Sequence, residues 1–238
     1  MPNQHSPEDH EPSQSRRVLR AVRSHVQPGS FPLLLVASLL LYVLNGLALD
    51  SMALVVVGRV GVGCAIVYVL SANRVTVWLG VLVLGLGIPL EARLWVFDPH
   101  VSRVLADSLA TGLLLWVLVV VLREVFRPTT TDRDAVIGAL CGFLIILIVF
   151  MRLHGLIEAL VPGSYHADGP PLSERSDMAL VAMFQYFSTI TVTTVGYGDI
   201  VPVTSIARLV TGLEAIVGQL YLAVVIATLV GRAAVRRE

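Results

Sequence analysis

The sequence predicts an all-α membrane protein in which a four-helix bundle is followed by a two-helix module with a re-entrant helix. Hydrophobic residues make up 55% of the 238 residues, charged residues only 14%, and the mean hydropathy is +0.79. A soluble domain carries nearer a quarter charged residues, because water must wet its surface. The composition therefore argues against a soluble enzyme, and the formal net charge of zero gives no support to a nucleic-acid partner.

Six apolar segments are long enough to cross a bilayer, since about 20 helical residues span roughly 30 Å of hydrocarbon. Gly46 and Ala48 would suit a cleavage site in the first segment. Its apolar core is longer than that of a signal peptide, however, so we expect a retained anchor. The expected spans are 31–49, 52–71, 75–92, 104–122, 135–155 and 203–230.

The arginines predict the orientation of these spans. Cytoplasmic loops carry an excess of basic residues, and an even number of spans leaves both termini on one side. With both termini cytoplasmic, the external segments hold only Arg93, Arg103 and Arg175 of the arginines outside the spans. We therefore expect a multi-pass protein of the plasma membrane, in contact with its lipids. Residues 1–30 form a polar cytoplasmic tail, in which 16–27 is either a basic helix on the inner leaflet or simply a topology signal.

A shorter apolar segment, 178–192, lies between the fifth and sixth spans. It has no room to cross the bilayer, and a glycine-rich turn follows it. Such a helix is tolerated at membrane depth only if it lines a cavity or is buried in protein. We expect a re-entrant helix here.

The turn reads TTVGYGD, from Thr193 to Asp199. An ion that sheds water to enter a narrow passage needs oxygens in place of its hydration shell. Backbone carbonyls can supply them if successive residues alternate in backbone handedness, which glycine adopts at little steric cost. Gly196 and Gly198 stand at alternate positions of this turn.

This segment resembles the selectivity filter of potassium channels. The resemblance is specific over 135–235 and covers an outer helix, a pore helix at 178–192, a filter at 193–199 and an inner helix at 203–231. Over 31–125 it is only topological, to the voltage-sensor bundle of prokaryotic six-span channels in the tetrameric pore-loop superfamily. It implies a homotetramer that passes K⁺ as its permeant ion, without a cofactor or catalytic residues.

The resemblance also implies roles for individual residues. Carbonyls of the filter would bind K⁺, together with the Thr194 hydroxyl. The Tyr197 ring would point away from the ion and pack against Tyr186 and Phe187 of the pore helix. Thr193 would support the filter from below, and Asp199 would lie at the outer mouth. The implied ion-binding residues are Thr194, Val195, Gly196, Tyr197 and Gly198.

The last span resembles the inner helix of such channels. Gly218 lies where the family often has a hinge, although Gly212 and Gly218 could instead allow close helix packing. Residues at helical spacing on one face are expected to line the inner cavity and gate. These residues are Gln219, Leu222, Ile226 and Val230.

Glu214 lies near the membrane centre, where a carboxyl group is expensive and usually has a role. We expect it behind the filter, bonded to the re-entrant helix, either as a protonatable pH sensor or as a satisfied structural carboxyl. Many relatives brace the filter aspartate with an acid in the pore helix. Here Ile190 takes that position, so that brace is absent and filter inactivation is an open question.

The fourth span lacks the arginines at every third position that a voltage sensor needs. Arg103 and Arg123 only bracket it, so we expect little intrinsic voltage dependence. Arg59 in the second span and Asp107 in the fourth could form a buried pair. At the outer end of the fifth span, His154 and Glu158 either titrate or form a structural pair.

The sequence leaves two other functions open. One is a potassium transporter subunit, although such proteins usually carry several pore loops per chain, often with a single glycine each. The other is a membrane sensor that keeps a channel fold without conducting. The acidic loop with Asp168, Glu174 and Asp177 either concentrates cations at the outer mouth or is a solvated turn.

Overall fold

The computed structural model describes residues 30–47, 98–127, 130, 132–169 and 171–235, with short pieces between residues 63 and 86. The N-terminal tail, Arg59, and nearly all of the expected spans 52–71 and 75–92 lie outside the described residues. In the part described, three helices are long and apolar enough to cross a membrane, so this is a multi-pass membrane protein. The elements are α2 (Phe31–Gly46), α5 (Pro99–Val125), α6 (Asp132–Leu160), β1 (Tyr165–Ala167), a 3-10 turn (Leu172–Glu174), α7 (Asp177–Val192), β2 (Ile200–Pro202) and α8 (Ser205–Val235).

Local signals in the sequence set where these helices begin. Asp98 accepts hydrogen bonds from the backbone N–H groups of His100 and Val101, and a proline opens α5. Ser176 accepts from the N–H of Ala179 at the start of α7. Such side chains satisfy N–H groups that have no partner within the helix, so each start is well defined.

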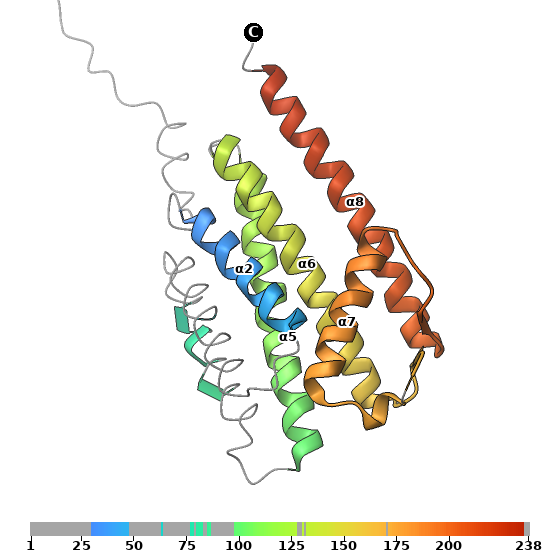
Figure 1. The fold of residues 1–238 in the computed structure, drawn as a ribbon. Helices are drawn as coiled ribbons and strands as arrows, with labels where there is room; N and C mark the ends of the chain where they lie inside the picture. The colour runs from blue at the N-terminus through green and yellow to red at the C-terminus, as the bar shows by residue number, and fades with distance from the viewer. Residues whose placement is uncertain are drawn as a thin grey trace, which may run out of the picture.

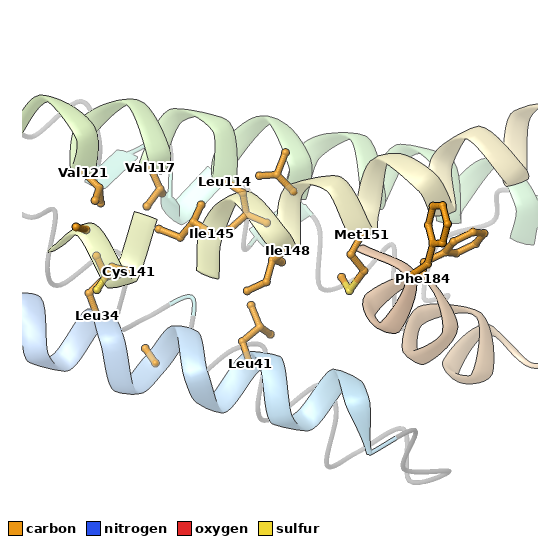
Figure 2. Close-up of a cluster of buried hydrophobic side chains, with 14 of the residues drawn as sticks. Leu34, Leu41, Leu114, Val117, Val121, Cys141, Ile145, Ile148, Met151 and Phe184 are labelled. Carbon is orange, nitrogen blue, oxygen red and sulfur yellow. The ribbon is translucent and has the colours of Figure 1, made fainter. Parts of the chain in front are cut away.

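The central helix of the described chain is α6, which contacts α2, α5, α7 and α8. Figure 1 shows α5 and α6 side by side, with α2 across them and α8 along the edge of the molecule. Leu34 and Leu41 of α2 and Val117 of α5 meet Ile145 and Ile148 of α6 in a buried apolar cluster (Figure 2). A short connection between α5 and α6 makes them antiparallel neighbours, which holds α5 against the central helix.

The acid of the fourth expected span has a partner that the sequence analysis overlooked. Asp107 of α5 accepts a hydrogen bond of 2.7 Å from Nη1 of Arg152 in α6. Arg152 lies inside the fifth expected span, and its side chain is only 8% exposed. The expected pairing of Asp107 with Arg59 lies outside the described residues; within them, Asp107 pairs with Arg152. A buried guanidinium in this position needs a carboxylate beside it, since an isolated charge is costly there.

The first helix also contacts the short helix α7. The Tyr42 hydroxyl lies 3.1 Å from Oγ1 of Thr189, and Nε2 of Gln185 donates to the Tyr42 carbonyl at 2.9 Å. A Cβ at Gly46 would lie 2.8 Å from Nε2 of Gln185, so the glycine permits this approach. α2 and α7 are thus joined directly by polar contacts.

A two-stranded antiparallel sheet lies at the end of the molecule that carries the glycine-rich turn. Strands β1 and β2 pair antiparallel, with Tyr165 opposite Pro202 and Ala167 opposite Ile200. This sheet joins the segment before α7 to the segment after the turn. It thereby fixes both ends of the α7–turn unit relative to α6 and α8.

Candidate functional site: the glycine-rich turn and its surroundings

The helix expected over 178–192 is α7, and the TTVGYGD turn begins where it ends. The Ile190 carbonyl accepts from the N–H groups of Val195 at 2.8 Å and Gly196 at 3.1 Å. The Thr193 hydroxyl donates to the Thr189 carbonyl at 2.6 Å. The last turn of α7 therefore anchors the first half of the glycine-rich turn through the backbone.

Positive φ recurs at every second residue of the turn. Gly196 has φ of 52° and Gly198 of 81°, at the positions where the sequence predicts this handedness. Thr194 also has a positive φ of 60°, and in the described residues it is the one non-glycine residue that does. A threonine in this region is strained, and such strain persists only where surrounding structure imposes it. The positive φ of Thr194 could not be predicted from its residue type, because threonine normally avoids this conformation.

The two expected supports of the Tyr197 ring lie in different places. Tyr186 stacks on Tyr197, with ring centroids 6.5 Å apart and an interplanar angle of 11°. Phe187 instead faces inward and packs against His154 and Tyr165, with centroids 5.0 and 5.6 Å away. Of the two available rings, Tyr186 therefore packs on Tyr197 in the single chain and Phe187 does not, because consecutive helical residues point in different directions.

Asp199 ends the turn and is held by the short helix. The Tyr186 hydroxyl donates to its Oδ2 at 2.8 Å, and the Ile200 N–H donates to its Oδ1 at 3.1 Å. Ile190 has no polar group to offer this aspartate, but Tyr186 contacts it from the same helix. The hydroxyl of Tyr186 was missed because the sequence analysis assigned this residue to ring packing alone.

In the single chain, all seven residues of the turn are exposed, and Tyr197 is 72% exposed. An apolar ring in a membrane protein is normally covered by lipid or protein. The turn therefore stands at a face of the chain that the described helices do not cover.

Gly218 of α8 lies against the end of α7. A Cβ at this position would lie 3.0 Å from the Val192 carbonyl oxygen and 3.1 Å from its Cγ1. At Gly212 a Cβ would meet nothing within 4 Å. The sequence leaves a hinge and a close-packing role open for Gly218, and the structure shows a close-packing contact there. The four residues expected to line an inner cavity are exposed on α8, namely Gln219, Leu222, Ile226 and Val230.

Glu214 is fully buried, on the side of α8 that faces the short helix. The Ser188 hydroxyl of α7 donates to its Oε1 at 2.6 Å, so the expected bond to this helix is present. Nε2 of His154 in α6 lies 2.8 Å from its Oε2. The expected pairing of His154 with Glu158 is wrong: Glu158 instead accepts from the N–H groups of Gly163 and Tyr165.

Tyr165 in β1 is the fourth member of this buried group. Its hydroxyl lies 2.6 Å from Nδ1 of His154, and its ring meets that of Phe184 edge to face at 5.0 Å. Burial, followed by the nearby carboxylates of Glu214 and Glu158, raises the pKa of the Tyr165 phenol. The phenol therefore remains a proton donor throughout the ordinary pH range.

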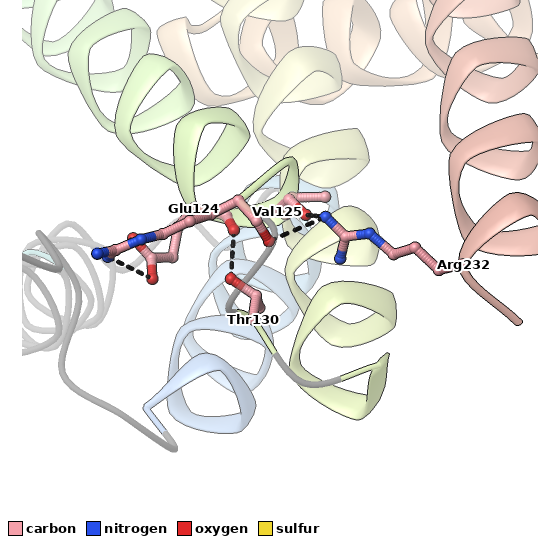
Figure 3. A network of polar contacts seen from close by, with 5 residues as sticks. Glu124, Val125, Thr130 and Arg232 are labelled. Carbon is pink, nitrogen blue, oxygen red and sulfur yellow. Dashed lines mark hydrogen bonds and ion pairs between the residues drawn. The ribbon is translucent and has the colours of Figure 1, made fainter. Parts of the chain in front are cut away.

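At the opposite end of the molecule, Arg232 near the end of α8 contacts the end of α5 (Figure 3). Its Nη2 donates to the Val125 carbonyl at 2.8 Å and to the Arg127 carbonyl at 3.0 Å. The last carbonyls of a helix have no intrahelical partner and carry partial negative charge. A guanidinium satisfies both needs and ties the end of α8 to the α5–α6 connection.

Arg103 near the start of α5 forms an ion pair with Asp177 in the first turn of α7. Of the three acidic residues expected near the turn, Asp177 thus contacts α5, while Asp168 and Glu174 are exposed.

Residues 173–234 match a family model described as "Ion channel". The matched range begins just before α7 and includes the glycine-rich turn and nearly all of α8. Comparison with curated proteins and with solved structures gives no match. The family match and the apolar helices support an ion-channel domain in a multi-pass membrane protein.

Proposed function

We propose that this chain is a subunit of a potassium-selective channel, in which four copies surround one permeation path. The observation that carries the proposal is the alternation of positive φ at Thr194, Gly196 and Gly198, directly after a short helix. Alternating handedness is the backbone requirement for stacking carbonyl oxygens along one line. The ion-channel match over the same residues supports the assignment.

The ion sites would be formed by carbonyls of residues 194–198, with the Thr194 hydroxyl at the inner end. These oxygens would replace the hydration shell of K⁺, and ions would displace one another through the row. The C-terminal end of α7 directs its partial negative charge toward an ion below the turn. Transport is then passive, down the electrochemical gradient.

Four copies are needed because one chain supplies one turn, and a ring of oxygens around an ion takes several. The exposure of the whole turn in the single chain supports this assembly. The helix α8 also supports this assembly, because it is strongly hydrophobic and yet mostly exposed in the single chain. Copies of the chain would cover part of this surface, and the face with Leu222 and Ile226 would line the inner cavity.

The proposed orientation has both termini in the cytoplasm, with the turn near the outer surface of the plasma membrane. Weak voltage dependence is part of the proposal, since the arginines of α5 stand at its two ends. Arg103 is already engaged by Asp177 in the outer half. The single turn with both glycines favours a channel over a transporter.

The test is reconstitution of the purified full chain in liposomes, with the reversal potential measured under a K⁺ gradient opposed by Na⁺. We expect reversal near the K⁺ equilibrium potential, and loss of this current in Gly196→Asp. Gly169→Asp is the matched control, because Gly169 also has positive φ but lies in the outer loop. It should retain the current.

Other results would identify the alternatives. Accumulation of K⁺ against its gradient would indicate a transporter subunit. A correctly assembled tetramer that passes no ions, even with the Gly218 region altered, would indicate a non-conducting sensor. Reversal midway between the K⁺ and Na⁺ potentials would contradict selectivity while leaving the channel function intact.

A further inference from the structure

A continuous row of hydrogen bonds runs behind the short helix and joins four segments of the chain. It leads from Tyr165 in β1 to His154 in α6, then to Glu214 in α8 and to Ser188 in α7. The three donor–acceptor distances are 2.6, 2.8 and 2.6 Å. The side chains of His154, Glu214 and Ser188 have no exposed surface.

The surroundings of this row are apolar. The Phe184 ring stacks on His154 with centroids 6.3 Å apart, and the Phe187 ring meets it edge to face at 5.0 Å. In such surroundings a polar group without a hydrogen-bond partner is strongly disfavoured, so the donors in the row must match its acceptors. Among the described residues, His154 is the one basic group within ion-pair distance of Glu214.

The other groups that face the row are few. On α6, Glu158 has its carboxylate engaged by two backbone N–H groups of the outer loop. On α8, the Thr211 hydroxyl lies beside the Tyr165 phenol and donates to the Ala207 carbonyl. On α7, the row ends at Ser188, which does not titrate. Glu214 and His154 are therefore the pair in this cluster that can exchange a proton.

Proton counting gives the row a fully matched state with one negative charge. With Glu214 ionised and His154 neutral, the Tyr165 hydroxyl donates to Nδ1, Nε2–H donates to Oε2, and Ser188 donates to Oε1. Each donor meets one acceptor, and the two oxygens of Glu214 are both used. The row then holds a single negative charge on Glu214, which His154 and Ser188 stabilise by hydrogen bonds.

One added proton breaks this match at one end of the row. A proton on Nδ1 faces the Tyr165 hydroxyl, which must then turn away, toward a group such as Thr211. A proton on Oε1 faces Ser188, which must then turn its hydroxyl away from the carboxyl group. In both cases one of the two terminal hydroxyl groups must rearrange, either that of Tyr165 in β1 or that of Ser188 in α7.

We propose that His154 and Glu214 form a proton-binding brace that positions the short helix α7, and that its protonation reduces conduction by loosening the support of the turn. This inference rests on the proposed channel function. Ser188 is two residues before Ile190, whose carbonyl holds the N–H groups of Val195 and Gly196. A change at Ser188 therefore reaches the turn through less than one helical turn of backbone.

The position of the brace indicates that external pH is the stimulus that changes conduction. Tyr165 belongs to the two-stranded sheet beside the glycine-rich turn, and it is the member of the row nearest the outer loops. His154 and Glu214 act as positioning residues, because neither belongs to the turn itself. A proton that enters from the outer side reaches His154 first.

The experiment measures K⁺ flux of the full chain in liposomes from about pH 5 to about pH 9, the range in which histidine and buried carboxyl groups titrate. We expect flux in the wild type to fall with acidification along a single-proton curve. Glu214→Gln should conduct at a pH-independent level, because its amide still accepts from His154 and does not titrate. Glu174→Gln, at an exposed carboxylate outside the row, is the matched control and should keep the wild-type pH profile.

His154→Gln tests the second member of the pair. Its side-chain amide can still donate to Glu214, so the tetramer should form, but the midpoint of the pH curve should shift. An unchanged midpoint in both Glu214→Gln and His154→Gln would overturn the proposal. If Glu214→Gln fails to assemble, Ser188→Ala replaces it, since it removes one hydrogen bond and should move the midpoint without abolishing titration.

A second readout does not depend on conduction. Infrared difference spectra between acid and neutral pH should show a carboxyl band that is present in the wild type and absent in Glu214→Gln. If the wild type passes no K⁺ at any pH, the channel proposal fails, while this band still decides whether the brace binds a proton. A spectrum identical in the two proteins would overturn the brace even in a conducting channel.

Discussion

The Tyr186 hydroxyl donates a hydrogen bond of 2.8 Å to Oδ2 of Asp199, 13 residues further along the chain. The same tyrosine stacks its ring on Tyr197 inside the turn. One side chain of α7 therefore contacts both the middle and the outer end of the turn. Since Ile190 leaves this helix without an acidic brace, Tyr186 is the described side chain that connects α7 to Asp199.

Tyr186→Phe separates these two contacts, because phenylalanine keeps the ring and loses the hydroxyl. We expect K⁺ current in liposomes or bilayers to decay several-fold faster than in the wild type, since Asp199 loses its side-chain donor. The measurement is the time course of current after channel opening. Phe187→Tyr adds a hydroxyl on the buried side and is not expected to slow or restore this decay. An unchanged decay in Tyr186→Phe would show that the ring alone supports the turn.

Gly218→Ala and Gly212→Ala form a matched pair on one helix. Both gain the same helix propensity, but a Cβ at Gly218 meets the Val192 backbone whereas a Cβ at Gly212 meets nothing within 4 Å of the single chain. We expect Gly218→Ala to be the less stable of the two by about 1–3 kcal/mol, the usual cost of overpacking. Thermal unfolding in detergent measures the difference. Equal stability combined with altered open probability would favour the hinge instead.

Asp107→Asn should destabilise the bundle, because it leaves Arg152 buried without a full counter-charge. The expected loss is about 3 kcal/mol, the lower end of the range for a buried ion pair that loses one partner. Unfolding of the purified protein in detergent reports it. Asp168→Asn, an exposed carboxylate of the outer loop, is the control. The double variant Asp107→Asn with Arg152→Gln should recover part of the loss, and no recovery would contradict a direct pairing.

The sequence predicted the features of this protein that depend on local pattern. The short helix ends at Val192, where the sequence analysis ends it, because hydropathy and the following glycines define that boundary. Gly196 and Gly198 could be assigned positive φ because few other residues adopt it. The bond between α7 and Glu214 was also predictable, since a carboxyl group at membrane depth needs a polar partner.

The missed features depend on how helices are rotated against one another. His154 and Glu214 are 60 residues apart, and Asp107 and Arg152 are 45 residues apart. Hydropathy places each residue at a depth but does not say which faces meet. Arg152 did carry a signal, because an arginine within an apolar span needs an acidic partner. Matching it to Asp107 by depth, instead of considering only Arg59, would have given the pair.

Arg232→Gln should release the inner end of α8 from the α5–α6 connection. Glutamine is shorter and neutral, so it cannot hold the carbonyls of Val125 and Arg127 together as a guanidinium does. We expect faster amide hydrogen exchange in the last two turns of α8. Arg232→Lys should be intermediate, since an ammonium group is a compact charge without the guanidinium fork. Arg208→Gln is the control, because its Nε donates to the Pro202 carbonyl at the other end of α8 and should leave this exchange unchanged.

The voltage response follows from where the charges of α5 stand. Arg103 is paired with Asp177 near the start of the helix, and Arg123 is exposed near its end, so no arginine of α5 lies between them. One elementary charge that crosses the whole field changes an equilibrium by about 2.3 kcal/mol per 100 mV, or roughly 50-fold. We expect the conductance in symmetrical K⁺ without blockers to change far less than this over 100 mV. A steep conductance–voltage curve would require mobile charges outside α5, and neutralising Arg59 would be the direct way to locate them.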